Sequence, residues 1–287
     1  IKRKVGVGVL GLADMLIELG VPYGSDESIG VIRDVMSFIN YHSKQESVNL
    51  AKERGSFPAF DRSRYASDDD FLMKRLSSGK GSVIASDEWS GLAEEIKTHG
   101  LRNAATVAAP PTGRSSQLIQ HSTASIEPVW SCFTPVSDEI SGAQVFNLEV
   151  GDTLKRVVIN PRLLGMLDRA GVPLDGELTE KIIESRGAIG DIAGIPKEIR
   201  EVFLTTGEIE PARHIAVVAE IQRHVDEAVS KTVNLPNDAT VGVVGDIYMG
   251  AWKANLKGIT VFRDGCVGEK QQIKLVAKKI RTVKVAG

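Results

Sequence analysis

The chain has 287 residues, of which 42% are hydrophobic and 25% are charged, and its 35 basic and 37 acidic side chains give a formal net charge of -2. These values are typical of a globular protein with one large domain or two small ones, and they exclude a largely disordered chain and a broadly basic nucleic-acid-binding protein. No uncharged apolar run approaches the ~18 residues of a membrane span, and the first residues lack a signal-peptide cleavage pattern.

The cysteines and histidines give no metal-binding or disulfide pattern. Cys132 and Cys266 are far apart in the sequence and belong to no CxxC pair, and the five histidines lack the spacing of metal ligands. We therefore expect free thiols, no structural zinc site and a reducing compartment, which points to a cytoplasmic protein.

The first motif, at residues 6–11, is spelled GxGxxG. A dinucleotide-binding site would need a strand before this motif and an acidic residue roughly 20 positions after it. Only five residues precede Gly6, and residues 12–19 read as a helix that ends at Gly20. The sequence therefore predicts glycines that let this helix pack closely on a neighbour, rather than a nicotinamide or flavin site.

A second helix is predicted from its caps and its spacing. Ser25 and Ser28 are candidate N-caps, apolar residues then recur at helical spacing, and the pattern stops at Gly55. Residues 56–90 are broken by proline and glycine, so we expect loops there. The acidic run 68–70 has no spacers between its carboxylates, which favours a solvated loop over a cation site.

The most informative stretch follows a short predicted helix at 92–99. Residues 104–109 are small and uncharged, which is typical of a strand buried on both faces. A polar loop at 110–116 comes directly after it, and a helix is expected to begin at Gln117. The order is strand, tight polar loop and helix N-terminus.

Such a loop presents unpaired backbone N–H groups next to the positive end of a helix dipole. Thr112, Ser115 and Ser116 add hydroxyl donors, Gly113 allows a ligand to approach the backbone closely, and Arg114 adds a positive charge. This combination predicts binding of a phosphate or another small anion. The loop lacks the GK[ST] of a Walker A motif, and an ordinary capped helix start remains the alternative.

The middle of the chain, about 130–194, is expected to be rich in loops, with a short helix at 161–171. Residues 214–229 have the apolar spacing of an amphipathic helix. His214 and His224 are ten positions apart and do not share a helix face, so we expect exposed or capping roles for them rather than metal binding.

The last third predicts a parallel strand–helix–strand unit. Residues 232–235 and 259–262 read as strands, and residues 244–256 read as the helix between them. This order predicts a right-handed crossover and hence an α/β protein. Residues 266–287 are expected to form a mildly basic, solvated extension.

Several segments resemble the catalytic chain of ribonucleotide reductases, and they follow the family's order. The segments are Lys4–Asp14, Asn49–Gly55, Ile96–Asn103 with the loop that follows it, Ile126–Pro128, Val225–Pro236 and Lys257–Gly265. The resemblance implies an α/β fold in which this chain is the C-terminal portion of a ten-stranded α/β barrel with helical crossovers. Residues 1–265 would form this part of the barrel, and residues 266–287 would follow it.

The resemblance also implies a substrate and a reaction. The family replaces the ribose 2′-hydroxyl of a ribonucleoside di- or triphosphate with hydrogen by thiyl-radical chemistry. Its substrate phosphates would lie on the anion loop, whose residues are Pro111, Thr112, Gly113, Arg114, Ser115 and Ser116.

The subclass follows from the last strand. Oxygen-dependent members have two adjacent tyrosines where this sequence has Val261 and Phe262, so the resemblance is closer to the adenosylcobalamin-dependent (class II) type. The Pro-Thr-Gly opening of the loop fits that class. Arg114 and the run 115–117 look more like the oxygen-dependent version, and the number of phosphates stays open.

The radical cysteine of the family stands in an Asn-x-Cys-x-Glu pattern, which neither Cys132 nor Cys266 has. No catalytic residue is therefore assigned here, and the chain alone is expected to be inactive. The resemblance places that pattern upstream of Ile1 and the recharging cysteines beyond Gly287. The implied partners are the ribonucleotide, an N-terminal portion or partner chain that carries the radical cysteine, a thioredoxin-like reductant and a second copy in a homo-oligomer.

Two other functions stay open at this point. The first is a non-catalytic protein that binds a nucleotide or phosphate, and the second is a related radical enzyme that acts on another nucleotide.

Overall fold

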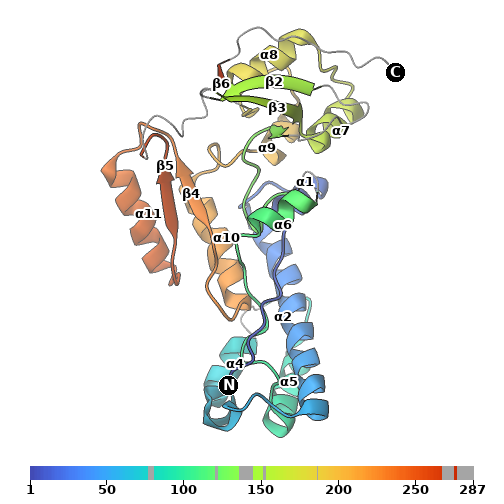
Figure 1. Cartoon of the computed structure of the whole chain (residues 1–287), viewed down its shortest axis with the longest axis vertical. Helices are drawn as coiled ribbons and strands as arrows, with labels where there is room; N and C mark the ends of the chain where they lie inside the picture. Colours follow the sequence, from blue (N-terminus) through green and yellow to red (C-terminus); the bar gives the residue numbers. More distant parts are fainter. Residues whose placement is uncertain are drawn as a thin grey trace.

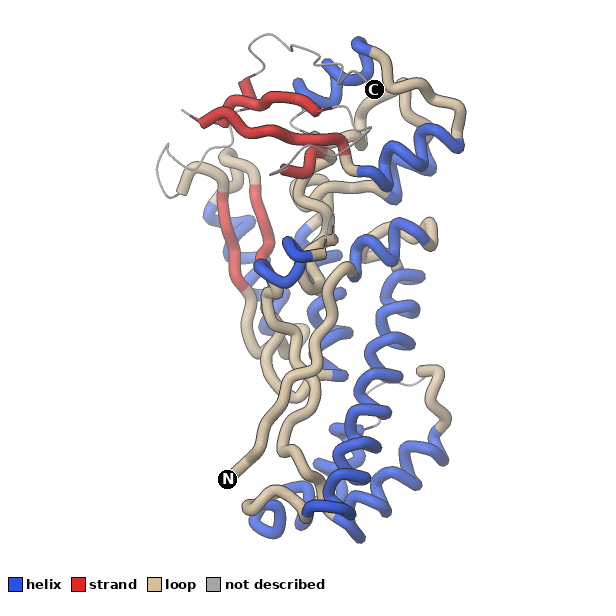
Figure 2. Tube along the Cα trace, turned by 45° about the vertical axis from the view of Figure 1, so that its right-hand side comes forward, coloured by secondary structure: helices blue, strands red, loops and turns tan. Residues whose placement is uncertain are grey.

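The elements of the protein lie along one long axis in three parts (Figure 1; Figure 2). The computed structural model describes residues 1–76, 81–119, 122–135, 145–150, 153–185, 187–266 and 275–276. A helical lobe occupies one end, an antiparallel sheet with its helices occupies the other, and a pair of parallel strands lies beside two helices between them. Separate apolar clusters fill the three parts. In the described ranges, no helix is both long and apolar enough to cross a bilayer.

The long helix α2 (Asp26–Arg54) follows the prediction from its caps. Its N-cap is Ser25, whose side chain accepts a hydrogen bond from the Ser28 N–H at 3.1 Å, and its C-cap is Gly55 with φ 75°. The positive φ at that position favours glycine. The predicted helix before it is also confirmed, as α1 (Leu12–Glu18).

Residues 56–90 contain more helix than the sequence predicts. The acidic run is not a solvated loop, because the Asp68 carboxylate accepts a hydrogen bond from the Phe71 N–H at 2.8 Å and the next two acids lie in a helical first turn. Negative side chains are favourable at such a position. The elements of this region are the 3-10 helix η1 (Phe60–Arg62), α3 (Arg64–Ser67), α4 (Asp69–Leu76) and α5 (Ser86–His99).

Residues 104–109 are extended and mostly buried, as predicted, but they pair through single bridges rather than a regular ladder. Val107 forms a parallel bridge with Val7, and Ala109 forms one with Val229. The glycines of the GxGxxG motif serve this contact, because a Cβ atom on Gly8 would lie 2.9 Å from Pro110 Cδ. Close packing is thus confirmed, but it involves the extended segment before α1 and not the helix.

The region from 130 to 194 is not rich in loops, which corrects the prediction. It contains an antiparallel sheet with strand order β1-β3-β2-β6, and the predicted short helix is present as α7. Buried apolar residues of β3 and the helices form one core cluster. The elements are β1 (Phe133–Pro135), β2 (Val145–Val150), β3 (Thr153–Ile159), α7 (Pro161–Arg169), α8 (Gly176–Glu184) and α9 (Lys197–Val202).

Part of the predicted C-terminal extension joins this sheet. Strand β6 (Leu275–Val276) pairs antiparallel with β2, so these two residues are not a solvated tail. The other residues of 267–287 lie outside the described residues.

The predicted parallel unit is confirmed. Strands β4 (Thr232–Leu235) and β5 (Thr260–Arg263) pair in parallel, and α11 (Val241–Lys253) connects them. This unit makes the fold α/β in its C-terminal part. Within the described residues the parallel strands do not close into a ring, so the ten-stranded barrel stays an expectation.

The predicted amphipathic helix is present as α10 (Pro211–His224), which ends five residues before the predicted end at 229, and its histidines are not exposed. His214 and His224 are both buried, and Nε2 of His224 lies 3.3 Å from Oε1 of Glu220. Burial, with a smaller contribution from the charge of Lys231, lowers the pKa of His214 to about 3. Of the expected exposed or capping roles, exposure is wrong for both histidines, because helix periodicity alone does not say which neighbours cover a face.

This buried histidine predicts a pH dependence of stability. The pKa of an unfolded histidine is ~6.5, so the unfolded chain gains a proton below that pH while the folded chain does not until pH approaches 3. The free energy of unfolding should fall by about 1.4 kcal/mol per pH unit from this site between pH 6 and 4. His214→Gln should remove that slope in urea titrations. The same change at exposed His99 is the control, and an unchanged slope in His214→Gln would contradict the account.

Candidate functional site

The predicted anion loop lies where the buried segment 104–109 ends. Its helix, α6 (Gly113–Leu118), begins four residues earlier than predicted. The N-cap is Thr112, whose φ of 48° and ψ of 21° are left-handed. The loop residues 113–116 therefore form the first turn of α6 (Figure 1).

Three backbone donors of this turn are available. The N–H groups of Gly113, Arg114 and Ser115 come before Ser116, whose N–H is the first to have an acceptor within the helix, and within the described ranges they make no hydrogen bond. The Ser116 N–H donates to the Thr112 carbonyl at 2.9 Å. The turn thus keeps the set of free N–H groups that an anion needs.

The side chains of the loop divide into exposed and internal groups. Pro111, Arg114 and Ser115 are exposed. The Ser116 hydroxyl is buried and donates to the Gly113 carbonyl at 3.1 Å. Ser116 therefore shapes the turn, while the exposed hydroxyl of Ser115 is accessible to a ligand.

The charge at the loop is positive. Arg114 is exposed and forms no ion pair within the part of the chain that the structure describes, and no acidic residue lies in the first turn of α6. An unpaired guanidinium beside free N–H groups favours a phosphate, which accepts several charge-assisted hydrogen bonds.

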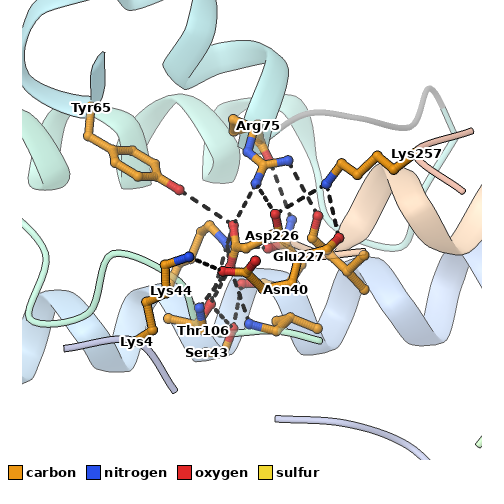
Figure 3. A network of polar contacts seen from close by, with 12 residues as sticks. Lys4, Asn40, Ser43, Lys44, Tyr65, Arg75, Thr106, Asp226, Glu227 and Lys257 are labelled. Atoms are coloured by element: carbon orange, nitrogen blue, oxygen red, sulfur yellow. Dashed lines mark hydrogen bonds and ion pairs between the residues drawn. The ribbon is translucent and has the colours of Figure 1, made fainter. Parts of the chain in front are cut away.

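A buried carboxylate fixes the segment that leads to this loop (Figure 3). The Asp226 side chain accepts hydrogen bonds from the N–H groups of Thr106 at 2.7 Å and Val107 at 3.2 Å. Lys44 Nζ lies 3.1 Å from both carboxylate oxygens, and Arg75 Nη2 lies 3.3 Å from one of them. The cluster joins α2 and α4 to the extended segment.

The charged groups of this Asp226 cluster shift one another's pKa values. Burial raises the pKa of the Asp226 carboxyl, but Lys44, the backbone N–H groups and Arg75 together lower it more, so its pKa lies below the ordinary value. Burial lowers the pKa of Lys44, and the attraction of Asp226 only partly opposes this effect. Asp226 therefore stays ionised at neutral pH and compensates two cations.

A second ion pair joins buried Lys231 to half-buried Glu127, which follows the loop in the sequence. Lys231 is buried and its Nζ lies 2.6 Å from Oε2 of Glu127, whose other oxygen accepts the Thr232 N–H at 3.0 Å. Burial lowers the pKa of Lys231 despite this partner. The pair ties the segment after α6 to the start of β4.

The cysteines do not form a site. Cys132 is buried, and burial raises its pKa well above the ordinary value, with a smaller contribution from Glu208, whereas Cys266 is exposed. Both thiols are free, as expected. Among the described residues, no group of His, Cys, Asp and Glu side chains could hold a metal ion.

Comparison with known proteins identifies the family. The ribonucleotide reductase barrel-domain family matches residues 1–262. This chain belongs to that family. A vitamin B12-dependent ribonucleoside-diphosphate reductase from Mycobacterium tuberculosis is 38% identical over 264 residues, and the homologue from Thermoplasma acidophilum is 35% identical over 262 residues. These matches cover 92% and 91% of this chain but 31% and 28% of the relatives, so the chain spans about a third of their length.

A solved structure supports the fold. The alpha subunit of the class Id ribonucleotide reductase from Actinobacillus ureae superposes with a TM-score of 0.65 over 91% of this chain and 39% of that subunit. The sequences are 20% identical, so the likeness concerns the fold alone. The expected relation to a reductase barrel is confirmed at the level of the family.

The sequence did not reveal the residues that support the loop. Asp226, Glu127 and Lys231 lie inside segments that resemble the reductase family, but no role was assigned to them. A buried ion pair leaves no periodic pattern, because its partners come from distant segments. Their charged side chains next to apolar, strand-like runs were the available signal.

The Asp226 cluster predicts a large loss of stability when the charge is removed. Asp226→Asn leaves Lys44 and Arg75 without compensation, and the free energy of unfolding should fall by about 3 kcal/mol in urea titrations. Lys4→Gln is the control, because it breaks the Lys4–Glu227 pair, whose side chains are 49% and 45% exposed, and should cost less than about 1 kcal/mol. Similar losses in both variants would contradict the central role of Asp226.

Proposed function

We propose that this chain supplies the substrate-phosphate loop of a vitamin B12-dependent ribonucleotide reductase, in which it is the C-terminal part of the catalytic barrel. The reaction is reduction of a ribonucleoside di- or triphosphate to the deoxyribonucleotide in the cytoplasm. One observation carries the proposal: an unpaired Arg114 stands beside three free N–H groups at the end of a buried extended segment. The names of the relatives support the reaction.

In this proposal residues 111–116 form the phosphate site. The N–H groups of Gly113, Arg114 and Ser115 donate to phosphate oxygens, and the Arg114 guanidinium adds a charge-assisted contact. The Ser115 hydroxyl adds a donor. Pro111, Thr112 and Ser116 hold the turn in shape.

The cofactor proposal rests on β5 and on the names of the relatives. Val261 and Phe262 lie in β5 and carry no phenolic O–H, so a tyrosine relay through that strand has no donor. Radical formation within the site fits this chemistry better, and adenosylcobalamin supplies a radical when it is bound. No residue of this chain is assigned to hold that cofactor.

The radical cysteine comes from polypeptide that this chain does not contain. Parallel strands are normally covered on both sides, yet the outer edge of β5 has no partner strand within the described residues. The apolar side chains of α11 next to it are exposed, with Val241 at 90% and Trp252 at 73%. In the proposal this surface meets the rest of the barrel, residues 1–265 are the barrel part of this chain, and residues 266–287 extend beyond it. The partners also include a thioredoxin-like reductant and a second copy in a homo-oligomer.

A non-catalytic nucleotide-binding protein is the second candidate. Its support is that Cys132 is buried and that neither cysteine has the Asn-x-Cys-x-Glu flanks. It differs from the reductase in needing no further segment.

The phosphate loop predicts discrimination between two probes. Arg114→Ala should weaken binding of cytidine diphosphate about tenfold in calorimetric titrations and leave cytidine binding unchanged, because only the diphosphate contacts the guanidinium. Arg62→Ala removes an exposed arginine of the helical lobe and is the matched control. Equal losses of affinity for cytidine diphosphate and cytidine in Arg114→Ala would indicate that Arg114 has only a packing role.

The partner surface predicts complementation. The chain alone should give no deoxyribonucleotide with adenosylcobalamin and a dithiol. Adding the part of the Mycobacterium tuberculosis relative that precedes the matched region should give a complex by sedimentation and restore turnover. Trp252→Glu should weaken the complex, whereas Trp130→Glu, at another exposed tryptophan, should not. Turnover by the chain alone, or a complex insensitive to Trp252→Glu, would contradict the proposal.

A further inference from the structure

Two strained residues meet behind the phosphate loop. Thr112 and Ser125 have φ values of 48° and 47°, in the left-handed region that non-glycine residues avoid, and a β-branched residue such as threonine avoids it most. The Ser125 N–H donates to Thr112 Oγ1 at 2.6 Å. Strained backbone of this kind persists only where the surrounding structure enforces it. The segments that carry Thr112 and Ser125 must therefore both be fixed by further contacts.

Asp14 holds the segment 122–125 from the side of α1. Its Oδ2 atom accepts hydrogen bonds from the Thr123 N–H at 2.6 Å, the Thr123 hydroxyl at 3.2 Å and the Ser122 hydroxyl at 3.3 Å. The side chain is buried, and its other oxygen lies 3.4 Å from Nη1 of Arg162. A buried carboxylate with this many donors fixes the backbone that it binds.

Two further contacts fix the ends of the segment. The Gly11 N–H donates to the Thr123 carbonyl at 2.8 Å, and the Glu127 N–H donates to the Ala124 carbonyl at 2.8 Å. Glu127 is itself anchored by buried Lys231. The segment is therefore tied to α1 on one side and to β4 on the other.

The consequence concerns the free N–H groups of α6. Thr112 is the residue immediately before Gly113, so its φ and ψ set the direction in which the first-turn N–H groups point. The Thr112 hydroxyl that accepts from Ser125 also keeps its own proton for donation. Movement of the segment would release Thr112 from the left-handed region and turn these donors away from a common point.

We propose that residues 122–125 form a brace that fixes the phosphate loop, with Asp14 and Ser125 as positioning residues that act through Thr112. Asp14 acts through its carboxylate and Ser125 through its N–H group. The proposal rests on the proposed function, since the ligand is the phosphate end of a nucleotide. It adds residues outside the loop that determine affinity for the phosphates without touching them.

Amide hydrogen exchange tests the brace without any ligand. Thr112→Val removes the acceptor for the Ser125 N–H at nearly constant shape, and exchange at the Ser125 amide should rise at least about tenfold. Thr112→Ser keeps the acceptor and should restore slow exchange. Equal exchange in both variants would overturn the brace.

Calorimetric binding of cytidine diphosphate and cytidine to the full chain tests the role in phosphate affinity. Asp14→Asn should weaken diphosphate binding about tenfold and leave cytidine binding unchanged. Asp168→Asn is the matched control, because it makes the same change at an exposed carboxylate of α7, so the diphosphate affinity should be that of the wild type. If Asp14→Asn does not fold, Thr112→Val takes its place.

The outcomes separate the two proposals. Equal binding of both probes by the wild-type chain would overturn the phosphate site and, with it, the role of the brace. Wild-type discrimination that survives in Asp14→Asn would overturn the brace alone. If Asp14→Asn lost affinity for the diphosphate and for cytidine equally, Asp14 would have only a structural role, and the inference would also be overturned.

Discussion

The arrangement of this protein depends on one buried carboxylate, that of Asp226. Two cations, Lys44 and Arg75, and two backbone N–H groups, from Thr106 and Val107, converge on it (Figure 3). Because these groups come from the helical lobe and from the extended segment, a single side chain sets the position of the backbone that leads into the phosphate loop. An exposed pair could not do this, since solvent screens most of its attraction.

The loop itself is supported from three directions. The Asp226 cluster fixes the segment before it, and the brace at 122–125 holds its strained N-cap. The pair of buried Lys231 with half-buried Glu127 ties the brace to the parallel strands. Free N–H groups can bind an anion without reorganisation only when the backbone that carries them is already fixed. The proposed phosphate site would therefore explain why buried charges hold the backbone around a short, exposed turn.

Local signals in the sequence were sufficient for the elements whose ends are marked by caps. Ser25 and Gly55 delimit α2, and the parallel unit at β4 and β5 appears close to its predicted bounds. The β2–β3 hairpin was missed, although its two strand-like runs, 145–150 and 153–159, are separated by only two residues in the sequence. The Asp226 cluster and the brace could not be predicted from the sequence, because they join residues that only the tertiary fold brings together.

The chain contains only part of what a ribonucleotide reductase needs. The chain belongs to the ribonucleotide reductase barrel family, yet it spans about a third of the length of its relatives and its cysteines lack the flanks of a radical site. In our proposal its own residues bind the substrate phosphates. In the proposed enzyme the thiyl radical is supplied by another segment.

The most direct test is a titration of the ¹⁵N-labelled chain with inorganic pyrophosphate, followed by two-dimensional NMR. The account predicts saturable shifts that are largest at the amides of Gly113, Arg114 and Ser115. Shifts confined to other basic segments, such as Lys2–Lys4, or the absence of saturable shifts at these three amides, would contradict it.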